Sequence, residues 1–412
     1  MNRRELLKGC TDFAKSMYQE EDINYSFAQN GANDEILVVI FLRGGYDGLN
    51  FLAPVDDKNY ISARGEDLRI TEENKNKGLS IDQNFLDADF RLHKNAKAIK
   101  ELYDDKKLAF VHASGLTNGT RSHFVAQQLI EKGTLKEKNL REGWLTRYLQ
   151  GSQSEELSAY AVGNNQPESL LAAKQVLSLN RIEDLKIGWN DELKNLMRNN
   201  YLGASFIQEQ GTSAMDIQKS LDEKSSTQNL HKVENIKKRM NEKKNKKGGK
   251  FYSNLNTLEA IIKMEVGLKV GTINFGGWDT HDGQQGRYEP KIQELCSGLA
   301  QFYNSLHQYH SKLNIVVMSE FGRRVKANKN GGTDHGYGNV MWTLGGNING
   351  GNIYGKWPGL ANDQLNKKVD LEITTDYRTV LAELMQKRMK QNDVASIFPK
   401  FNYKKSLGIY RA

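Results

Sequence analysis

The sequence has very little cysteine and no long hydrophobic run. Cys10 and Cys296 are the only cysteines in 412 residues, too few for a disulfide framework and without metal-ligand spacing. No apolar stretch approaches the roughly 18–20 residues that a membrane-spanning helix needs. We therefore expect no transmembrane segment, no disulfide-stapled fold and no cysteine-ligated metal site.

The excess of positive charge is confined to one segment. The formal net charge is +8, and residues 231–250 hold nine Lys or Arg against two Glu, which is +7 of that excess. The rest of the chain is close to neutral, and its hydrophobic content of 38% suffices for a core. We expect a solvated charge run at 231–250, with nucleic-acid binding there as the less favoured alternative.

The first residues look like an incomplete export signal. Residues 2–8, NRRELLK, resemble the twin-arginine motif, which bacterial signal peptides follow with an apolar stretch. Asp12, Lys15 and Glu20 follow here instead, so the segment fits a retained amphipathic helix better. The expectation is an N-terminal arm over residues 1–34 and a cytoplasmic protein, with export to the periplasm as the alternative.

Short apolar segments alternate with helical periodicity from residue 35 onward. Each segment is rich in branched or aromatic residues and flanked by glycine or polar turns, as buried parallel strands are. The expected strands are EILVVIFLR (35–43), KLAFVHAS (107–114), LKVGTINF (268–275), KLNIVVMSE (312–320) and NVMWTLGG (339–346). Helices are expected at 122–134, 254–267, 288–312 and 374–389, the last with Thr374 or Thr375 as its N-cap.

This alternation predicts an α/β fold with a doubly wound, mostly parallel sheet flanked by helices. Residues 35–412 are expected to form one such domain. Residues 208–250 interrupt it as a flexible basic insertion, because they are rich in Ser, Lys, Asn and Gln and lack apolar periodicity. The stretch RGGYDG has the wrong glycine spacing for a dinucleotide fingerprint, so no nucleotide cofactor is expected.

Polar residues follow the expected strands at their carboxyl ends. Ligands of open α/β sheets bind beyond these ends, so we expect the polar residues to converge on one site. They are Asp47 and Asn50 after the first strand; His112, Thr120, Ser122 and His123; Asp279, His281 and Asp282; Glu320; and Asp334 and His335 in a later loop.

Carboxylates and imidazoles without a thiolate suit a divalent cation. Zinc is the favoured ion, with Mn, Mg or Ca as alternatives, and one or two ions are expected. Two ions about 4 Å apart would clamp the attacking and leaving oxygens of a displacement. Ser122 stands where a helix starts, and the free N–H groups there favour an anionic ester. A metal would make its hydroxyl a nucleophile.

Each of these residues also has an ordinary structural interpretation. Asp47 precedes a glycine as turn aspartates do, and Ser122 by itself is more often an N-cap than a nucleophile. Asp279 is also a candidate helix cap. Glu320 has two arginines, Arg323 and Arg324, close enough in sequence for a structural ion pair.

Several motifs come in the order seen in a bacterial protein family. They are LRGGYDGLN, LHKNAKAIKELYDDKKLAFVHASG, RSHFVAQ, GGWDTHDGQ, SEFGRR, TDHGYGN, GGNIYGKWPGL and TTDYRTVLAEL. With them the chain resembles domain of unknown function 1501, a family placed in the alkaline-phosphatase/sulfatase superfamily. The resemblance covers roughly residues 35–390 without the insertion at 208–248. It implies an alkaline-phosphatase-like fold with a one- or two-metal site that cleaves phosphate or sulfate esters.

The resemblance also implies roles for individual residues. Asp47 and Glu320 would bind one metal, while Asp279, His281 and His335 would bind the other. Ser122 lies where the superfamily keeps its nucleophile, with Thr120 as the alternative. The full candidate set is Ser122, Thr120, His123, Arg121 and Arg323 for catalysis and Asp47, Asp279, His281, Glu320, Asp334 and His335 for metal binding, with Arg324 as a further contact for the substrate anion.

Four departures from the superfamily pattern bear on these roles. Phe321 follows Glu320 where a histidine is expected, so a second metal lacks an imidazole. Gly283 occupies the position four residues after Asp279 where another histidine is expected, and His281 would have to serve. Val125 stands where the family often has an acidic residue. The absence of C-x-P-x-R excludes a sulfatase that uses formylglycine.

The expected function is hydrolysis of a small anionic ester, phosphate in preference to sulfate, with a hydroxyl nucleophile and one or two metals. One alternative is a binding or interaction module that keeps the fold without turnover. Another is a nuclease or phosphodiesterase that uses the basic insertion. The substrate, the metal and the oligomeric state are left open.

Overall fold

The computed structural model describes residues 35–151, 157–182 and 249–411, except residues 74, 85–87, 164 and 175, together with residues 195–196 and 199–200. The expected arm at 1–34 lies outside the described residues, and so does nearly all of the expected insertion at 208–250. The contacts group the chain into two compact units. Unit 1 comprises residues 1–36 and 141–272, and unit 2 comprises residues 37–140 and 273–412.

Unit 2 is built on strands that are buried along nearly their whole length. Strands β1 (Ile36–Leu42), β5 (Leu108–Gly115), β8 (Val270–Phe275), β9 (Leu313–Ser319) and β10 (Asn339–Gly345) match the expected strands to within two residues, and β1 and β8 begin in unit 1. The hydrogen-bonded order is β11–β5–β10–β9–β1–β8, where β11 is Ile353–Tyr354, and β12 (Thr375–Asp376) also pairs with β5. Strands this apolar on both faces require helices on both sides.

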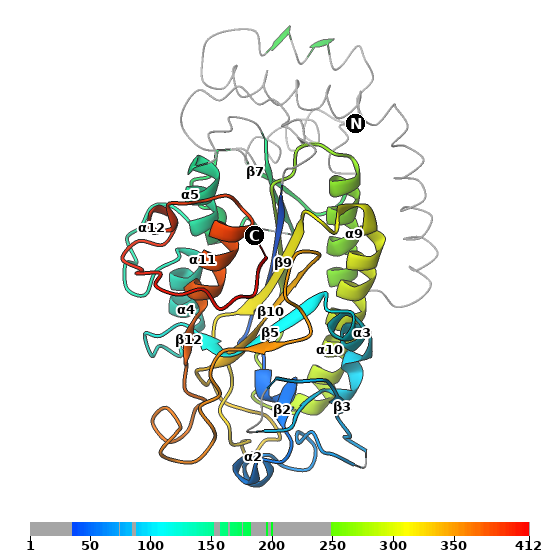
Figure 1. The fold of residues 1–412 in the computed structure, drawn as a ribbon. Coiled ribbons are helices and arrows are strands. Elements are labelled where there is room, and N and C mark those ends of the chain that lie inside the picture. The colour runs from blue at the N-terminus through cyan, green and yellow to red at the C-terminus, as the bar shows by residue number, and fades with distance from the viewer. Residues whose placement is uncertain are drawn as a thin grey trace. The chain divides into compact units, whose positions relative to one another are not determined.

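Helices cover the sheet of unit 2 on both sides (Figure 1). Helices α4 (His123–Glu131) and α11 (Tyr377–Lys387) lie on one side, and α3 (Lys97–Asp104) and α10 (Gln284–Ser305) lie on the other. Helices α2 (Lys58–Ala63) and α12 (Val394–Ile397) and a small antiparallel sheet of β2 (Leu52–Pro54), β4 (Phe90–Leu92) and β3 (Leu79–Ser80) complete the unit. The predicted α/β fold, a mostly parallel sheet flanked by helices, is confirmed.

Unit 1 contains α5 (Trp144–Gly151), β6 (Ala159–Val162), β7 (Val176–Leu179) and α9 (Lys250–Lys263). Strands β6 and β7 pair in parallel, with Ala159 opposite Val176. Helix α9 buries Leu255, Leu258 and Ile262 on the face that packs near β6. Within the described part of the chain, none of the helices combines the length and the hydrophobicity that crossing a membrane requires.

Two local expectations were wrong. Strand β10 runs antiparallel to both of its neighbours, β5 and β9. A parallel neighbour needs a long crossover, usually a helix, and the described segment from β9 to β10 contains none. The N-cap of α11 is Asp376, whose carboxylate accepts from the N–H of Arg378 at 2.9 Å, while Thr375 belongs to β12.

His112 on β5 lies in the core of unit 2. Its Nδ1 accepts from the N–H of Ala113 at 2.8 Å, and its ring packs against Phe90 and Trp357. Burial lowers the pKa of His112 to about 4, although the hydrogen bond to the carbonyl of Leu52 opposes this. His112 therefore serves the core as a neutral residue.

This burial makes stability depend on pH. Below about pH 6.5 the unfolded chain binds a proton at His112, whereas the folded chain does so only near pH 4. The free energy of unfolding should therefore fall by about 1.4 kcal/mol per pH unit from this group as the pH drops through that window. His112→Gln should reduce the slope measured by urea denaturation between pH 7 and 4.5. His307→Gln, at an exposed position, is the control. Equal slopes for the wild type and His112→Gln would contradict this account.

Candidate functional site

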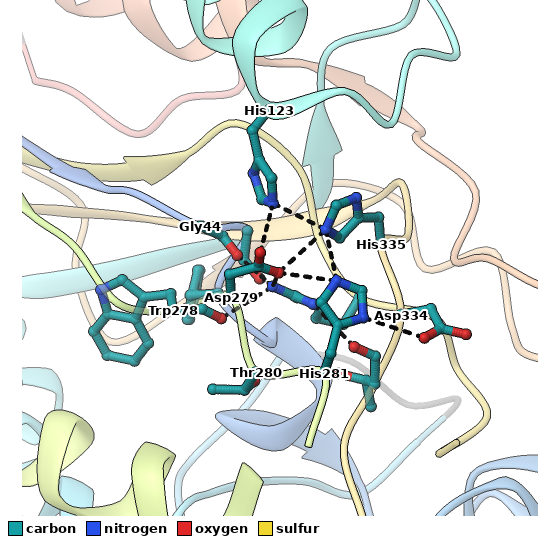
Figure 2. A network of polar contacts seen from close by, with 12 residues as sticks. Gly44, His123, Trp278, Asp279, Thr280, His281, Asp334 and His335 are labelled. Atoms are coloured by element: carbon teal, nitrogen blue, oxygen red, sulfur yellow. Dashed lines mark hydrogen bonds and ion pairs between the residues drawn. The ribbon is translucent and has the colours of Figure 1, made fainter. Parts of the chain in front are cut away.

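Side chains from distant parts of unit 2 converge at one edge of its sheet. His123 opens α4, Asp279 and His281 follow β8, and His335 precedes the antiparallel strand β10. In Figure 2 the three imidazole rings are turned toward one another and toward the carboxylate of Asp279. This edge holds the carboxyl ends of β1, β8 and β9, where ligands of α/β sheets bind.

The atoms at the centre of this cluster are close together. Nε2 of His335 lies 2.9 Å from Nε2 of His123 and 2.9 Å from Nε2 of His281. The carboxylate of Asp279 lies 3.1 Å from Nε2 of His335 and of His281, and 3.4 Å from Nε2 of His123. Ligand atoms of His123, Asp279 and His335 all fall within 4.8 Å of one another. Around tetrahedral zinc such atoms are about 3.3 Å apart, so the cluster has the size of a metal site.

Each imidazole is oriented by an oxygen acceptor at its outer nitrogen. Nδ1 of His123 lies 2.7 Å from a carboxylate oxygen of Glu320, and Nδ1 of His281 lies 3.3 Å from Asp334. Nδ1 of His335 lies 2.9 Å from the backbone carbonyl oxygen of Arg121. A ring that donates its Nδ1 proton keeps an unprotonated Nε2, which is the metal-binding form. When all three rings are neutral, three such lone pairs face one another.

Asp279 is held by the buried guanidinium of Arg323. Burial disfavours the charged carboxylate, but the hydrogen bond and charge of Arg323 prevail and lower the pKa of Asp279 to about 2. The Nη2 of Arg323 donates to Asp279 at 2.6 Å. Its other acceptors are the carbonyl oxygens of Gly44, Gly45, Trp278 and Thr333. Arg323, expected to contact the substrate, thus has donors that face protein acceptors.

Glu320 lies behind His123 instead of beside it. The side chain is buried, and one oxygen accepts from Nδ1 of His123, from Gln127 at 2.8 Å and from the N–H of Gly44 at 2.8 Å. The other oxygen accepts from Ser319 at 2.9 Å. Burial would raise the pKa of Glu320, but the hydrogen bonds from His123 and Gln127 outweigh it and lower the pKa. Glu320 thus orients a candidate ligand and makes no ion pair with Arg323.

Asp47 lies outside the converging cluster. Its carboxylate forms a buried ion pair with Arg64, whose Nη2 donates at 3.0 Å, and it also accepts from Gln284 at 2.7 Å. The N–H of Asn50 donates to it at 3.2 Å. The structure thus gives Asp47 a place in a polar network that ties α2 to α10.

Three candidate catalytic residues precede His123 at the start of α4. Ser122 is the N-cap, is exposed, and makes no side-chain hydrogen bond to the helix. Thr120 accepts from the N–H of Ser122 at 3.3 Å. The guanidinium of Arg121 pairs with the buried carboxylate of Asp370. The hydroxyl of Ser122 is therefore not used as a helix cap.

Phe321 explains one glycine of the RGGYDG motif. The ring of Phe321 packs 4.7 Å from the ring of His123 and 5.1 Å from that of His335, measured between centroids. A Cβ on Gly45 would lie 2.6 Å from the Phe321 ring, and the φ of Gly45 is +63°. The phenyl ring thus forms an apolar wall of the site and requires a glycine beside it.

Gln127 was missed at the sequence level. It donates to Glu320 at 2.8 Å, and Arg43 donates to it at 3.1 Å. The signal was available: His123, Gln127 and Glu131 are four residues apart and so share one face of a helix. No pattern in the sequence indicated Arg43, because Gln127 and Glu131 lie 84 and 88 positions away from it.

The structure defines an α/β protein with a cluster of histidines and a carboxylate able to hold a metal. The family model described as protein of unknown function (DUF1501) matches residues 109–398, and the chain belongs to this family, as its motifs indicated. No curated protein matches the sequence.

One similar solved structure is described as a protein in the alkaline phosphatase superfamily from Vibrio parahaemolyticus. It is 8% identical, the match covers 84% of this chain and 69% of that one, and the TM-score is 0.26. A TM-score this low supports no inference about this chain. Its place in that superfamily therefore stays a prediction.

Asp47 and Asp279 should respond differently to the same change. Asp47→Asn leaves the buried charge of Arg64 without its counter-charge and should cost about 3–5 kcal/mol of unfolding free energy. Asp279→Asn, at a half-exposed carboxylate, should cost less but should lower the zinc retained after dialysis, as measured by elemental analysis. Zinc lost from a folded Asp47→Asn variant, or kept by Asp279→Asn, would reverse this assignment.

Proposed function

We propose that the protein is a metal-dependent hydrolase of a small anionic ester, phosphate in preference to sulfate. His123, Asp279 and His335 would hold one divalent cation, with His281 as the fourth donor. Imidazoles and a carboxylate suit zinc best, and because a catalytic zinc site keeps one position for water or substrate, His281 would give up its place to the ester. The observation that carries this proposal is that every imidazole has an oxygen at Nδ1 and directs Nε2 to the same point.

One ion is proposed and not two. The expected ligands of a second ion were Asp47 and Glu320, and both have their oxygens engaged by protein donors. Each would have to give up a buried hydrogen bond or ion pair to bind a cation, which costs several kcal/mol, of the order of 3–5 for a buried ion pair.

The residues around the cluster fit an ester with a negative charge. Ser122 presents a hydroxyl at the N-terminus of α4, where free N–H groups favour an anion. The guanidinium groups of Arg121, paired with Asp370, and of Arg324, 39% exposed and 3.9 Å from Asp334, would turn a donor to the anion. A bound zinc ion would lower the pKa of a hydroxyl and stabilise charge on a phosphoryl oxygen. The Ser122 oxygen would displace the alcohol of the ester, and water would then release the anion from the serine, with Thr120 as the alternative nucleophile.

A binding or interaction module without turnover is the second candidate. It is favoured by Phe321, whose ring packs against His123 and His335 where the resemblance leads one to expect a further histidine. Such a protein would hold the same single cation and bind an anionic partner without cleaving it.

Activity on a chromogenic phosphoester such as p-nitrophenyl phosphate separates the two candidates. EDTA should abolish hydrolysis, added zinc should restore it, and Ser122→Ala should lower kcat by about a thousandfold. Ser62→Ala, at an exposed serine on α2, is the matched control, and Thr120→Ala tests the alternative nucleophile. A rate of hydrolysis that changes neither with EDTA nor in the Ser122→Ala variant would contradict the mechanism. Bound zinc with no hydrolysis of phosphate or sulfate esters would favour the binding module.

A further inference from the structure

Helix α4 carries a polar stripe directed toward the candidate metal centre. His123, Gln127 and Glu131 follow one another at intervals of four residues and therefore lie along one side of the helix. His123 is in the metal cluster and Glu131 is buried, so the stripe runs from the site into the protein. Polar groups in such a position must find partners.

Arg43, just after β1, joins two members of this stripe. Its Nη2 forms an ion pair with Glu131, and its Nη1 donates to the amide oxygen of Gln127 at 3.1 Å. Its Nε donates to Asn274 on β8 at 3.0 Å. The guanidinium is therefore fixed by three groups from two elements, and it presents one donor to Gln127.

This contact decides which way the amide of Gln127 points. The amide oxygen faces the cation of Arg43, and the amide nitrogen donates to the carboxylate of Glu320 at 2.8 Å. The flipped amide would place its oxygen against the carboxylate and its N–H groups against the guanidinium. Both contacts would be repulsive, so the charges at the two ends select one orientation.

The oriented amide completes the set of donors around Glu320. One oxygen of Glu320 accepts from Gln127, from the N–H of Gly44 and from Nδ1 of His123. A carboxylate with these donors has one position and one remaining direction for accepting from His123. The His123 ring is thereby aimed with Nε2 toward Asp279 and His335.

We propose that Arg43 and Gln127 are positioning residues of the metal centre: Arg43 orients the amide of Gln127, which holds Glu320 in place to aim His123. Neither touches the cation or the substrate. The inference rests on the metal site of the proposed function. It assigns a share of the affinity for the cation to Gln127, which is separated from the cation by two residues, and to Arg43, which is separated from it by three.

Gln127→Met tests this role, because it keeps the length of the side chain and removes both polar contacts. The dissociation constant for zinc, measured by competition with a chromophoric chelator, should rise about tenfold, at the lower end of the range for outer-shell residues. The visible spectrum of the cobalt-substituted protein should change as well, because the ligand geometry changes. The melting temperature of the metal-free protein shows whether the fold is intact.

Gln128→Met is the matched control, since it makes the same change at the next position of α4. It should leave the zinc affinity and the cobalt spectrum as in the wild type. Arg43→Lys keeps a charge for Glu131 but loses the fork that reaches Gln127, and it should weaken zinc a few-fold. The double variant Arg43→Lys/Gln127→Met should bind zinc no more weakly than Gln127→Met alone, because Arg43 acts through Gln127.

The outcomes separate the two proposals. Wild-type protein that binds no zinc would overturn the proposed function and the positioning role together. Wild-type zinc binding with an unchanged affinity and cobalt spectrum in folded Gln127→Met would overturn the positioning role alone. Equal effects of Gln127→Met and Gln128→Met, or additive effects of Arg43→Lys and Gln127→Met, would also overturn it.

Discussion

The site depends on one buried guanidinium, that of Arg323. Its acceptors are carbonyl oxygens in the loops after β1 and β8 and in the loop before β10, together with the carboxylate of Asp279. A buried arginine has five N–H donors in a rigid plane and must satisfy them within the protein. The loops can therefore meet in only a narrow range of arrangements, and these arrangements bring Asp279 to His335.

Around this anchor, each imidazole is fixed from a different direction. Glu320 at the end of β9 holds His123, Asp334 holds His281, and a backbone carbonyl holds His335. Side chains that are already oriented lose little freedom when a ligand binds, and this favours affinity. The hydrogen bonds that hold His123 continue from Glu320 through Gln127 to Arg43.

The amino-acid sequence predicted the fold well, because buried strands and amphipathic helices are local patterns. The five strands were located to within two residues. The direction of β10 was missed, since it depends on the connection from β9 and not on the strand residues. The N-cap of α11 was missed because Thr374, Thr375 and Asp376 all resemble caps, and only the backbone decides among them.

Residues of the site were harder to predict than strands. Asp279, His281 and His335 were expected near one another, and the structure brings them together. Asp47 and Glu320 were expected to bind a metal because they are carboxylates that follow strands. The role of a carboxylate, however, depends on the hydrogen-bond donors nearest to it in the folded protein. For Asp47 that donor is Arg64, and no spacing in the sequence indicates this pairing.

The three histidines differ in whether a substitution can remove the hydrogen-bond acceptor that orients the ring. A single substitution at Glu320 or Asp334 removes the acceptor that orients His123 or His281. The acceptor of His335 is the main-chain carbonyl of Arg121, which every amino acid possesses. The side chain at position 121, which here pairs with the buried Asp370, therefore has no part in orienting His335.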